Sequence, residues 1–229
     1  MTSEPGGRQE RNFSGNIPLV IAGAGGFGRE VAWLVAAINE ADNRPHFTLR
    51  GFLDPSKPSH PLPAPYLGDE AWAEWHLAKE TQFVVAVGAP ALRRRIATRL
   101  EQAGFVPATL VHPRAEVGPS VRLGPGGVVC AGAVLTVDVQ VGRHGLLNLN
   151  CTVGHDCQLG DFVTLAPGVH LSGATRLGHG VEVGTGAVTL PQVSLADGAI
   201  LGAGAVLTHD AAKPGTYVGI PARPMASDH

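Results

Sequence analysis

A histidine followed directly by an aspartate, His155-Asp156, is the pair of residues in this sequence that best suits acid–base chemistry. A neighbouring carboxylate can orient one imidazole nitrogen and leave the other as a general base whose pKa lies near neutral pH. A lone surface histidine carries no such implication, and we assign no role to the histidines at positions 144, 170, 179 and 209. The pair therefore predicts proton abstraction from an amine or a hydroxyl group.

A glycine-rich turn is the second stretch suited to chemistry. The segment Gly23-Ala24-Gly25-Gly26-Phe27-Gly28 matches the pattern G-x-G-x-x-G between a short apolar run and a helical pattern. Glycines let the backbone approach a phosphate, and the N-terminus of the following helix favours its negative charge. Asp54, at the end of the next expected strand, is placed to hold a ribose hydroxyl. Two interpretations fit this short segment: it binds one phosphate-bearing ligand rather than a complete dinucleotide, or it is a tight turn without any ligand.

The residues around His155 belong to a long hexad repeat. An aliphatic residue recurs at every sixth position from Val111 to Leu207, with Thr189 as the exception, and a small residue usually follows it. This period fits neither an α-helix nor a strand-and-turn meander. It is typical of a parallel β-helix, in which three hexads form one triangular coil and successive coils stack about 4.8 Å apart. His155 and Asp156 then lie at a corner, away from the aliphatic core.

The first part of the chain has a different pattern. Apolar runs at 17–22, 47–53 and 83–87 alternate with helical patterns that begin near residues 27, 70 and 91, which indicates a small doubly wound α/β sheet. The sequence therefore predicts four segments. They are a flexible extension (1–16), a Rossmann-like domain (17–106), a β-helix (107–208) and a C-terminal tail that packs on the last coil (209–229).

Composition argues against several partners. The formal net charge of −2 leaves no basic surface for nucleic acid. No apolar run is long enough to cross a membrane, and the polar start lacks the hydrophobic core of a signal peptide. Cys130, Cys151 and Cys157 have no metal-ligand spacing. We interpret them as buried reduced thiols, which favours a cytoplasmic protein.

Several segments resemble the NeuD/PglD type of sugar acetyltransferases, which includes sialic-acid O-acetyltransferases and nucleotide-4-amino-sugar N-acetyltransferases. The matching segments are GAGGFGREV, GFLDP, VVAVGAPALRRRI, LVHPRAEVGPSV, LLNLNCTVGHDCQLGDF and VGIPARP. The resemblance implies a left-handed parallel β-helix after the Rossmann-like subdomain, a homotrimer, and acetyl-CoA bound between neighbouring β-helices without a metal. The implied reaction is acetyl transfer to an amino or hydroxyl group of a sugar. A UDP-linked 4-amino-sugar for surface-glycan synthesis is the expected acceptor.

The resemblance also implies roles for individual residues. His155 matches the general base, and Asp156 matches its carboxylate partner. The positions matched to the nucleotide-sugar site are Gly25, Gly26, Phe27, Gly28, Asp54, Gly88, Arg93 and Asn148. The positions matched to the acetyl-CoA site are Thr164, Gly173, Ile220 and Pro221. Phe27 and Thr164 stand where the family often has histidine, and Phe27 cannot donate a hydrogen bond to a phosphate or a sugar.

Three other functional classes share features with this sequence and are alternatives to an acetyltransferase. A zinc lyase of the γ-carbonic-anhydrase type shares the β-helix but needs a His-x4-His pair, and residue 160 is glycine. A non-catalytic hexapeptide scaffold would bind a partner through its flat faces and have no affinity for acetyl-CoA. An NAD-dependent oxidoreductase needs a longer Rossmann unit than this chain provides.

Overall fold

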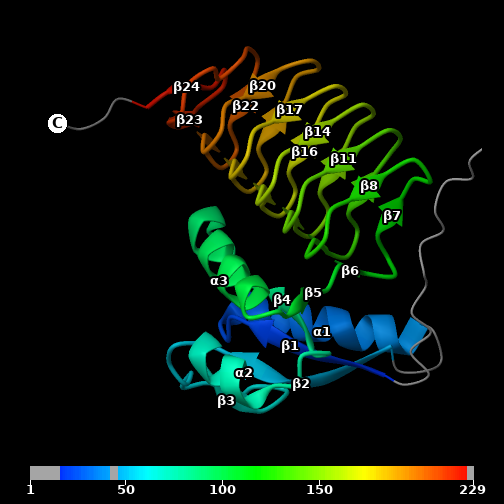
Figure 1. The fold of residues 1–229 in the computed structure, drawn as a ribbon. Coiled ribbons are helices and arrows are strands. Elements are labelled where there is room, and N and C mark those ends of the chain that lie inside the picture. The colour runs from blue at the N-terminus through cyan, green and yellow to red at the C-terminus, as the bar shows by residue number, and fades with distance from the viewer. Residues whose placement is uncertain (1–15, 42–45, 226–229) are drawn as a thin grey trace, which may run out of the picture.

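The computed structural model describes residues 16–41 and 46–225, so most of the expected N-terminal extension lies outside the described residues. An α/β unit and a long prism of stacked coils lie side by side (Figure 1). The elements of the α/β unit are β1 (Ile17–Ala22), α1 (Gly26–Ala41), β2 (Phe47–Leu53), β3 (Tyr66–Gly68), α2 (Glu70–His76), β4 (Gln82–Val85), α3 (Pro90–Gln102) and β5 (Val106–Pro107).

The five strands of this unit form one parallel sheet in the order β3-β2-β1-β4-β5. The chain moves outward from β1 on one side and then returns to its other side, so the topological switch point lies between β1 and β4. Ligands of such sheets bind outside the carboxyl ends of the strands at this point. The glycine-rich turn follows β1, Asp54 follows β2, and Gly88 lies shortly after β4. The sequence pattern had not indicated β3, a three-residue strand that follows a proline-rich segment.

The prism is a left-handed parallel β-helix. The hexad period predicts the parallel β-helix, and the family resemblance predicts its left hand. Its strands are β6 (Leu110–Val111), β7 (Glu116–Val117), β8 (Arg122–Leu123), β9 (Val128–Val129), β10 (Val134–Leu135), β11 (Gln140–Val141), β12 (Leu146–Leu147), β13 (Thr152–Val153), β14 (Gln158–Leu159), β15 (Thr164–Leu165), β16 (His170–Leu171), β17 (Arg176–Leu177), β18 (Glu182–Val183), β19 (Val188–Thr189), β20 (Ser194–Leu195), β21 (Ile200–Leu201) and β22 (Val206–Leu207). The tail adds β23 (Thr216–Val218) alongside β21, and β24 (Arg223–Pro224) antiparallel to β23.

Three parallel sheets form the faces of the prism. Face 1 contains β6, β9, β12, β15, β18 and β21; face 2 contains β7, β10, β13, β16, β19 and β22; face 3 contains β8, β11, β14, β17 and β20. In the third coil, residues 148–151 turn from face 1 to face 2, residues 154–157 turn from face 2 to face 3, and residues 160–163 turn back to face 1. We call these edges vertex 1-2, vertex 2-3 and vertex 3-1.

Two features recur in every coil: an inward-facing residue in each strand, and a corner residue with a positive φ. The second residue of almost every strand points inward, so that Leu147, Val153 and Leu165 are completely buried. Thr189, the exception in the repeat, is also buried and hydrogen bonds through its hydroxyl to Ser172 and Thr175. Every sixth residue from Gly126 to Gly204 has a positive φ, because each corner needs one residue in the left-handed region.

The α/β unit packs on face 1. The outward residues Leu110, Val128 and Leu146 of this face share one hydrophobic cluster with Val31 and Val35 of α1. The main packing between the α/β unit and a strand of the prism, that of α1 on β6, lies on this face. Vertex 2-3 is therefore the edge of the prism that lies farthest from the α/β unit, on the side opposite face 1.

Candidate active site

His155 and Asp156 form a hydrogen-bonded pair at vertex 2-3. Nδ1 of His155 lies 2.7 Å from Oδ2 of Asp156, and about two thirds of each side chain is exposed. Asp156 is the corner residue with φ of 60°, and this turn brings its carboxylate back to the preceding imidazole. Because an ionised carboxylate can only accept, Nδ1 carries the proton and Nε2 keeps its lone pair. The pair thus has the geometry expected of an oriented general base.

Gly173, on the next coil, supports the imidazole. A Cβ atom built on Gly173 would lie 2.5 Å from Nε2 of His155, so any side chain there would displace the ring. Within the described residues, the Gly173 N–H donates to no protein acceptor, which leaves it free to meet an oxyanion. The sequence-predicted base, its carboxylate partner and Gly173, which the resemblance matches to the acetyl-CoA site, therefore lie together on one exposed edge.

Two other histidines at the same place of the hexad lack this arrangement. His179 lies at vertex 3-1, where its Nδ1 accepts a hydrogen bond from the backbone N–H of Asp161. His209 lies at vertex 2-3 and is followed by Asp210, so it repeats the sequence pattern of the predicted base. However, Nδ1 of His209 faces the Thr208 hydroxyl, and the Asp210 carboxylate accepts from the Ser194 N–H. Only at His155 do the described contacts join an imidazole to the following carboxylate.

The glycine-rich turn separates into open and tightly packed positions. A Cβ atom on Gly25 or Gly26 would meet no atom within 4 Å, and both residues are exposed at the start of α1. A Cβ atom on Gly28 would lie 2.1 Å from the carbonyl oxygen of Gly23, so Gly28 serves the packing of helix on strand. Phe27 is half-buried against the cluster under α1. Gly25 and Gly26 therefore line open space in which a phosphate fits.

Asp54 holds the glycine-rich turn in place. Its Oδ2 atom accepts from the Ala24 N–H at 3.0 Å, and its Oδ1 atom accepts from the Ser56 N–H at 3.2 Å. Gly88, which lies shortly after β4, is exposed, and a Cβ atom there would meet nothing within 4 Å. Together with the glycine-rich turn, these positions surround the switch point of the sheet.

Arg93 and Thr164 do not fit the ligand roles that the family resemblance implies. Arg93 is 2% exposed, and its guanidinium donates to five backbone carbonyls and to the Thr164 hydroxyl. Thr164 is buried, and its own proton goes to the Gly88 carbonyl at 2.7 Å. Burial lowers the pKa of Arg93 to about 10, opposed by Glu182, so the side chain remains a cation at neutral pH. Both residues instead join the α/β unit to the β-helix.

Asn148, Ile220 and Pro221 lie at vertex 1-2, one edge away from His155. Oδ1 of Asn148 accepts from the Leu149 N–H, and Ile220 is 76% exposed in the turn before β24. One protomer therefore presents the predicted residues in three places. These are the base with Gly173 at vertex 2-3, Asn148 with Ile220 and Pro221 at vertex 1-2, and the glycine-rich turn in the unit on face 1.

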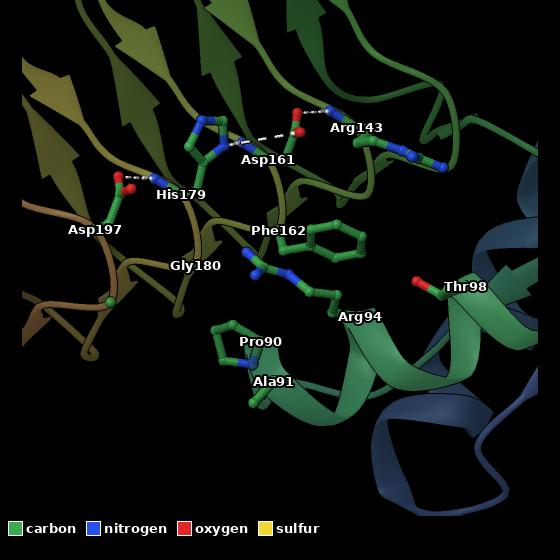
Figure 2. A pocket seen from close by; sticks show the side chains of 11 residues that line it. Pro90, Ala91, Arg94, Thr98, Arg143, Asp161, Phe162, His179, Gly180 and Asp197 are labelled. Carbon is green, nitrogen blue, oxygen red and sulfur yellow. Dashed lines mark hydrogen bonds and ion pairs between the residues drawn. The ribbon is translucent and has the colours of Figure 1, made fainter.

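A cavity of about 720 Å³ lies between α3 and vertex 3-1, and none of the residues predicted for the active site lines it (Figure 2). The Arg94 guanidinium lies over the Phe162 ring there, 5.1 Å from its centroid. Asp161 and Asp197 use one carboxylate oxygen each to accept a backbone N–H of the neighbouring coil. Among the described residues, no group of three or more His, Cys, Asp or Glu is arranged to hold a metal ion, and no helix is long and apolar enough to span a membrane.

Comparison with known proteins identifies relatives of both parts of the chain. Residues 18–100 match the PglD N-terminal domain family. The acetyltransferase domain of PglB from Neisseria gonorrhoeae FA1090 is 36% identical, with a TM-score of 0.85 over 92% of this chain and 100% of that domain, and its structure is also known in complex with acetyl coenzyme A. PerB from Caulobacter crescentus, solved in complex with CoA and GDP-perosamine, is 30% identical, with a TM-score of 0.81 over 93% of this chain and 98% of that one.

Curated sequences give a partial match. GDP-perosamine N-acetyltransferase of Escherichia coli O157:H7 is 31% identical over 106 residues, which cover 46% of this chain and 48% of that protein. The chain spans about half the length of the first curated relatives that it matches. The PglB domain and PerB, in contrast, are covered almost completely, at 36% and 30% identity. With a matching N-terminal domain, a matching β-helix and an oriented His-Asp pair, the chain belongs to the NeuD/PglD-type family of sugar acetyltransferases.

Proposed function

We propose that this protein transfers the acetyl group of acetyl-CoA to the amino group of a nucleotide-linked 4-amino-sugar in the cytoplasm, with His155 as general base. The observation that carries the proposal is the 2.7 Å contact between His155 and Asp156 on an exposed edge. The relatives support it, because PglB was solved with acetyl coenzyme A and PerB with GDP-perosamine. There are thus two candidate acceptors: the UDP-linked sugar expected from the resemblance, and a GDP-linked sugar like the GDP-perosamine named for two relatives.

The proposed reaction is direct acyl transfer. Nε2 of His155 takes a proton from the sugar amine while the amine nitrogen attacks the carbonyl carbon of the thioester. The carbonyl oxygen becomes an oxyanion, which the free Gly173 N–H is placed to meet; loss of one such donor costs about 3 kcal/mol in other enzymes. When the C–S bond breaks, the imidazolium returns the proton to the departing thiolate. Asp156 holds the ring and stabilises its transient positive charge.

One protomer cannot complete this site by itself. The glycine-rich turn belongs to the unit on face 1, whereas His155 lies on the opposite edge of the prism. A neighbouring protomer must therefore supply either the acceptor site or the base. We propose a homotrimer in which vertex 2-3 of one protomer faces vertex 1-2 of the next, so that His155 meets Asn148 and Ile220 of its neighbour.

The chemistry of the faces supports this assembly. Face 2 presents Val134, Val188 and Val206 as outward residues in addition to the polar ones. Face 3 presents only charged and polar outward residues, which are Arg122, Gln140, Gln158, Arg176 and Ser194. Apolar surface favours a protein interface, and charged surface favours water. Face 2, which lies between the two vertices that must meet, is thus the better face for contact between protomers.

Mixed oligomers test the proposal. His155→Ala removes the base, and Gly26→Val fills the space in which a phosphate fits. Each variant alone should be inactive. When the two are unfolded and refolded together, about a quarter of the interfaces combine an intact base with an intact glycine-rich turn, so activity should return to about that fraction of wild type. A mixture that stays inactive, or a protein that light scattering shows to be a monomer, would contradict the shared site.

A further inference from the structure

The break in the aliphatic repeat, Thr189, lies directly behind the proposed oxyanion donor. Residues 172–175 form the corner of vertex 2-3 that carries Gly173, one coil after His155. Thr175, the inward residue of this corner, and Thr189, the inward residue of β19 on the next coil, are both completely buried. Their hydroxyl oxygens lie 2.9 Å apart inside an otherwise apolar core. Because a buried polar group lowers stability unless it is hydrogen bonded, the partners of this pair matter.

The two hydroxyls close a cycle of hydrogen bonds on Ser172, which we call the hydroxyl cycle. The Thr175 hydroxyl lies 2.7 Å from the Ser172 carbonyl oxygen, and since a carbonyl only accepts, Thr175 gives its proton there. Thr189 must then donate to the Thr175 oxygen, and its own oxygen accepts from the Ser172 N–H at 3.1 Å. The cycle has one consistent direction, in which each hydrogen bond strengthens the next.

The hydroxyl cycle replaces a hydrogen bond that the other coils make between backbone groups. The N–H of the residue that follows an inward strand residue donates to a backbone carbonyl of the next coil, as Gly154 does to Leu171. Along the described coils, every position of this series from residue 112 to residue 190 follows that rule except Ser172, whose N–H donates to the Thr189 side chain. The exception therefore falls at the corner next to the proposed base.

The hydroxyl cycle fixes the direction of the Gly173 N–H. This N–H and the Ser172 carbonyl belong to one peptide group, which is planar and trans, so the two bonds point in opposite directions. The carbonyl oxygen is held inside the core by the Thr175 hydroxyl and by the Cys157 thiol at 3.3 Å. The N–H therefore points outward, to the exposed edge that carries His155. Hydrogen bonds to the carbonyl oxygen also polarise the amide and make its N–H a stronger donor.

We propose that Thr175 and Thr189 are positioning residues for acetyl transfer, which orient and polarise the Ser172–Gly173 peptide so that the Gly173 N–H meets the oxyanion. Both side chains are completely buried, so neither touches a substrate. The inference rests on the proposed function, because it takes this N–H as the oxyanion donor. A donor that is fixed before the reaction stabilises developing negative charge without reorganisation.

Thr175→Val/Thr189→Val removes both hydroxyls and keeps the shape of the side chains. Valine already fills the inward corner place of other coils, as at Val163, Val169 and Val181. Replacement of both hydrogen-bond partners by apolar groups of the same shape is nearly neutral for stability, so the melting temperature should stay close to that of the wild type. The kcat should fall about tenfold, which is part of the roughly 100- to 1000-fold loss that follows removal of a whole oxyanion donor. The Kd of acetyl-CoA should stay within about twofold, because an oxyanion donor acts in the transition state.

Thr175→Ser/Thr189→Ser gives the opposite result, because it keeps both hydroxyls and loses two buried methyl groups. Its melting temperature should fall, whereas its kcat should stay within about threefold of the wild type, too small a change for a lost oxyanion donor. The pH dependence of kcat should keep its wild-type shape in both variants, since the hydroxyls act on the Gly173 N–H and not on the imidazole.

Cys151→Val is the matched control at the same inward place of vertex 1-2. The Cys151 thiol donates to the Ala166 carbonyl, as Cys157 does to Ser172, but the residue after Ala166 is Pro167, which has no N–H to orient. This variant should keep kcat within about twofold of the wild type, since no donor to an oxyanion is affected.

Acetyl transfer by these variants is measured beside that of His155→Ala. Wild-type kcat in the valine pair, equal losses in the valine and serine pairs, weaker binding of acetyl-CoA, or a displaced pH profile would overturn the positioning role. If His155→Ala is inactive in the same assay, such a result leaves the proposed function intact. Transfer by His155→Ala at the wild-type rate would instead overturn the proposed chemistry, and the positioning role with it. A loss in the valine pair that is absent from the serine pair supports the positioning role.

Discussion

Arg93 should contribute more to stability than any other charged residue of the α/β unit. Its guanidinium is the only described donor to the carbonyl oxygens of Val87, His144 and Phe162. Arg93→Ala leaves these three acceptors without their described donor, two of them (His144 and Phe162) in a buried place and one (Val87) in a partly buried place. An unsatisfied buried polar group costs about 1–3 kcal/mol, and some water will enter the space, so we expect a loss of about 3–5 kcal/mol in the free energy of unfolding.

The chain offers a convenient assay for this loss. All three tryptophans, Trp33, Trp72 and Trp75, lie in the α/β unit, so fluorescence reports its unfolding, while circular dichroism also reports the β-helix. In urea, Arg93→Ala should move the fluorescence transition to lower concentration and separate it from the transition seen by circular dichroism.

Arg95→Ala is the matched control, because Arg95 is exposed on the same helix. It should change the free energy of unfolding by no more than about 0.5 kcal/mol. If Arg93→Ala were as stable as Arg95→Ala, the interpretation of Arg93 as the residue that joins the two parts would be wrong.

Two further predictions concern the glycine-rich turn and acid stability. Gly26→Ala should leave the melting temperature nearly unchanged, whereas Gly28→Ala should lower it strongly, because only the second Cβ atom meets backbone; thermal unfolding of both variants distinguishes them. Burial lowers the pKa of His144, although the hydrogen bond to Glu101 opposes this shift. The neutral imidazole therefore stabilises the folded state fully above the unfolded pKa of about 6.5, and this stabilisation declines as the pH falls below that value. The urea midpoint of the wild type should therefore decrease when the pH is lowered from 7.5 to 5.5. The decrease should be smaller in His144→Phe, which keeps an aromatic ring stacked on Phe162. Equal decreases in the two proteins would refute the role of His144.

The hexad repeat could be read from the sequence because its rule is local. An inward aliphatic residue and a corner residue recur at fixed spacing, so Leu147 and Val153 take their places without knowledge of distant contacts. The glycine-rich turn was predictable for the same reason. The three-residue strand β3 was not, because it pairs with β2 across a proline-rich segment that by itself indicates a loop.

The positions of individual side chains depended on packing between distant segments. Arg93 and Thr164 are 71 residues apart and meet only because α3 lies against vertex 3-1, where β15 begins. Position in the hexad alone also cannot separate His155 from His179, since residues four hexads apart fall on different vertices. Nor does a following aspartate suffice, because Asp210 turns to Ser194 rather than to His209. Sequence patterns predicted which residues can do chemistry, whereas the fold decides which of them are available.

The central claim is that His155 is the base, and the most direct test compares two histidine variants in one assay. Acetyl transfer from acetyl-CoA is measured with UDP-linked and GDP-linked 4-amino-sugars, and acetyl-CoA binding is measured separately. His155→Ala should lower kcat by roughly two to four orders of magnitude while acetyl-CoA binding is retained. His179→Ala, at the same hexad place on another vertex, should stay within about twofold of the wild type, a change too small to reflect loss of a general base. Transfer by His155→Ala at a rate close to that of the wild type would contradict the proposed chemistry.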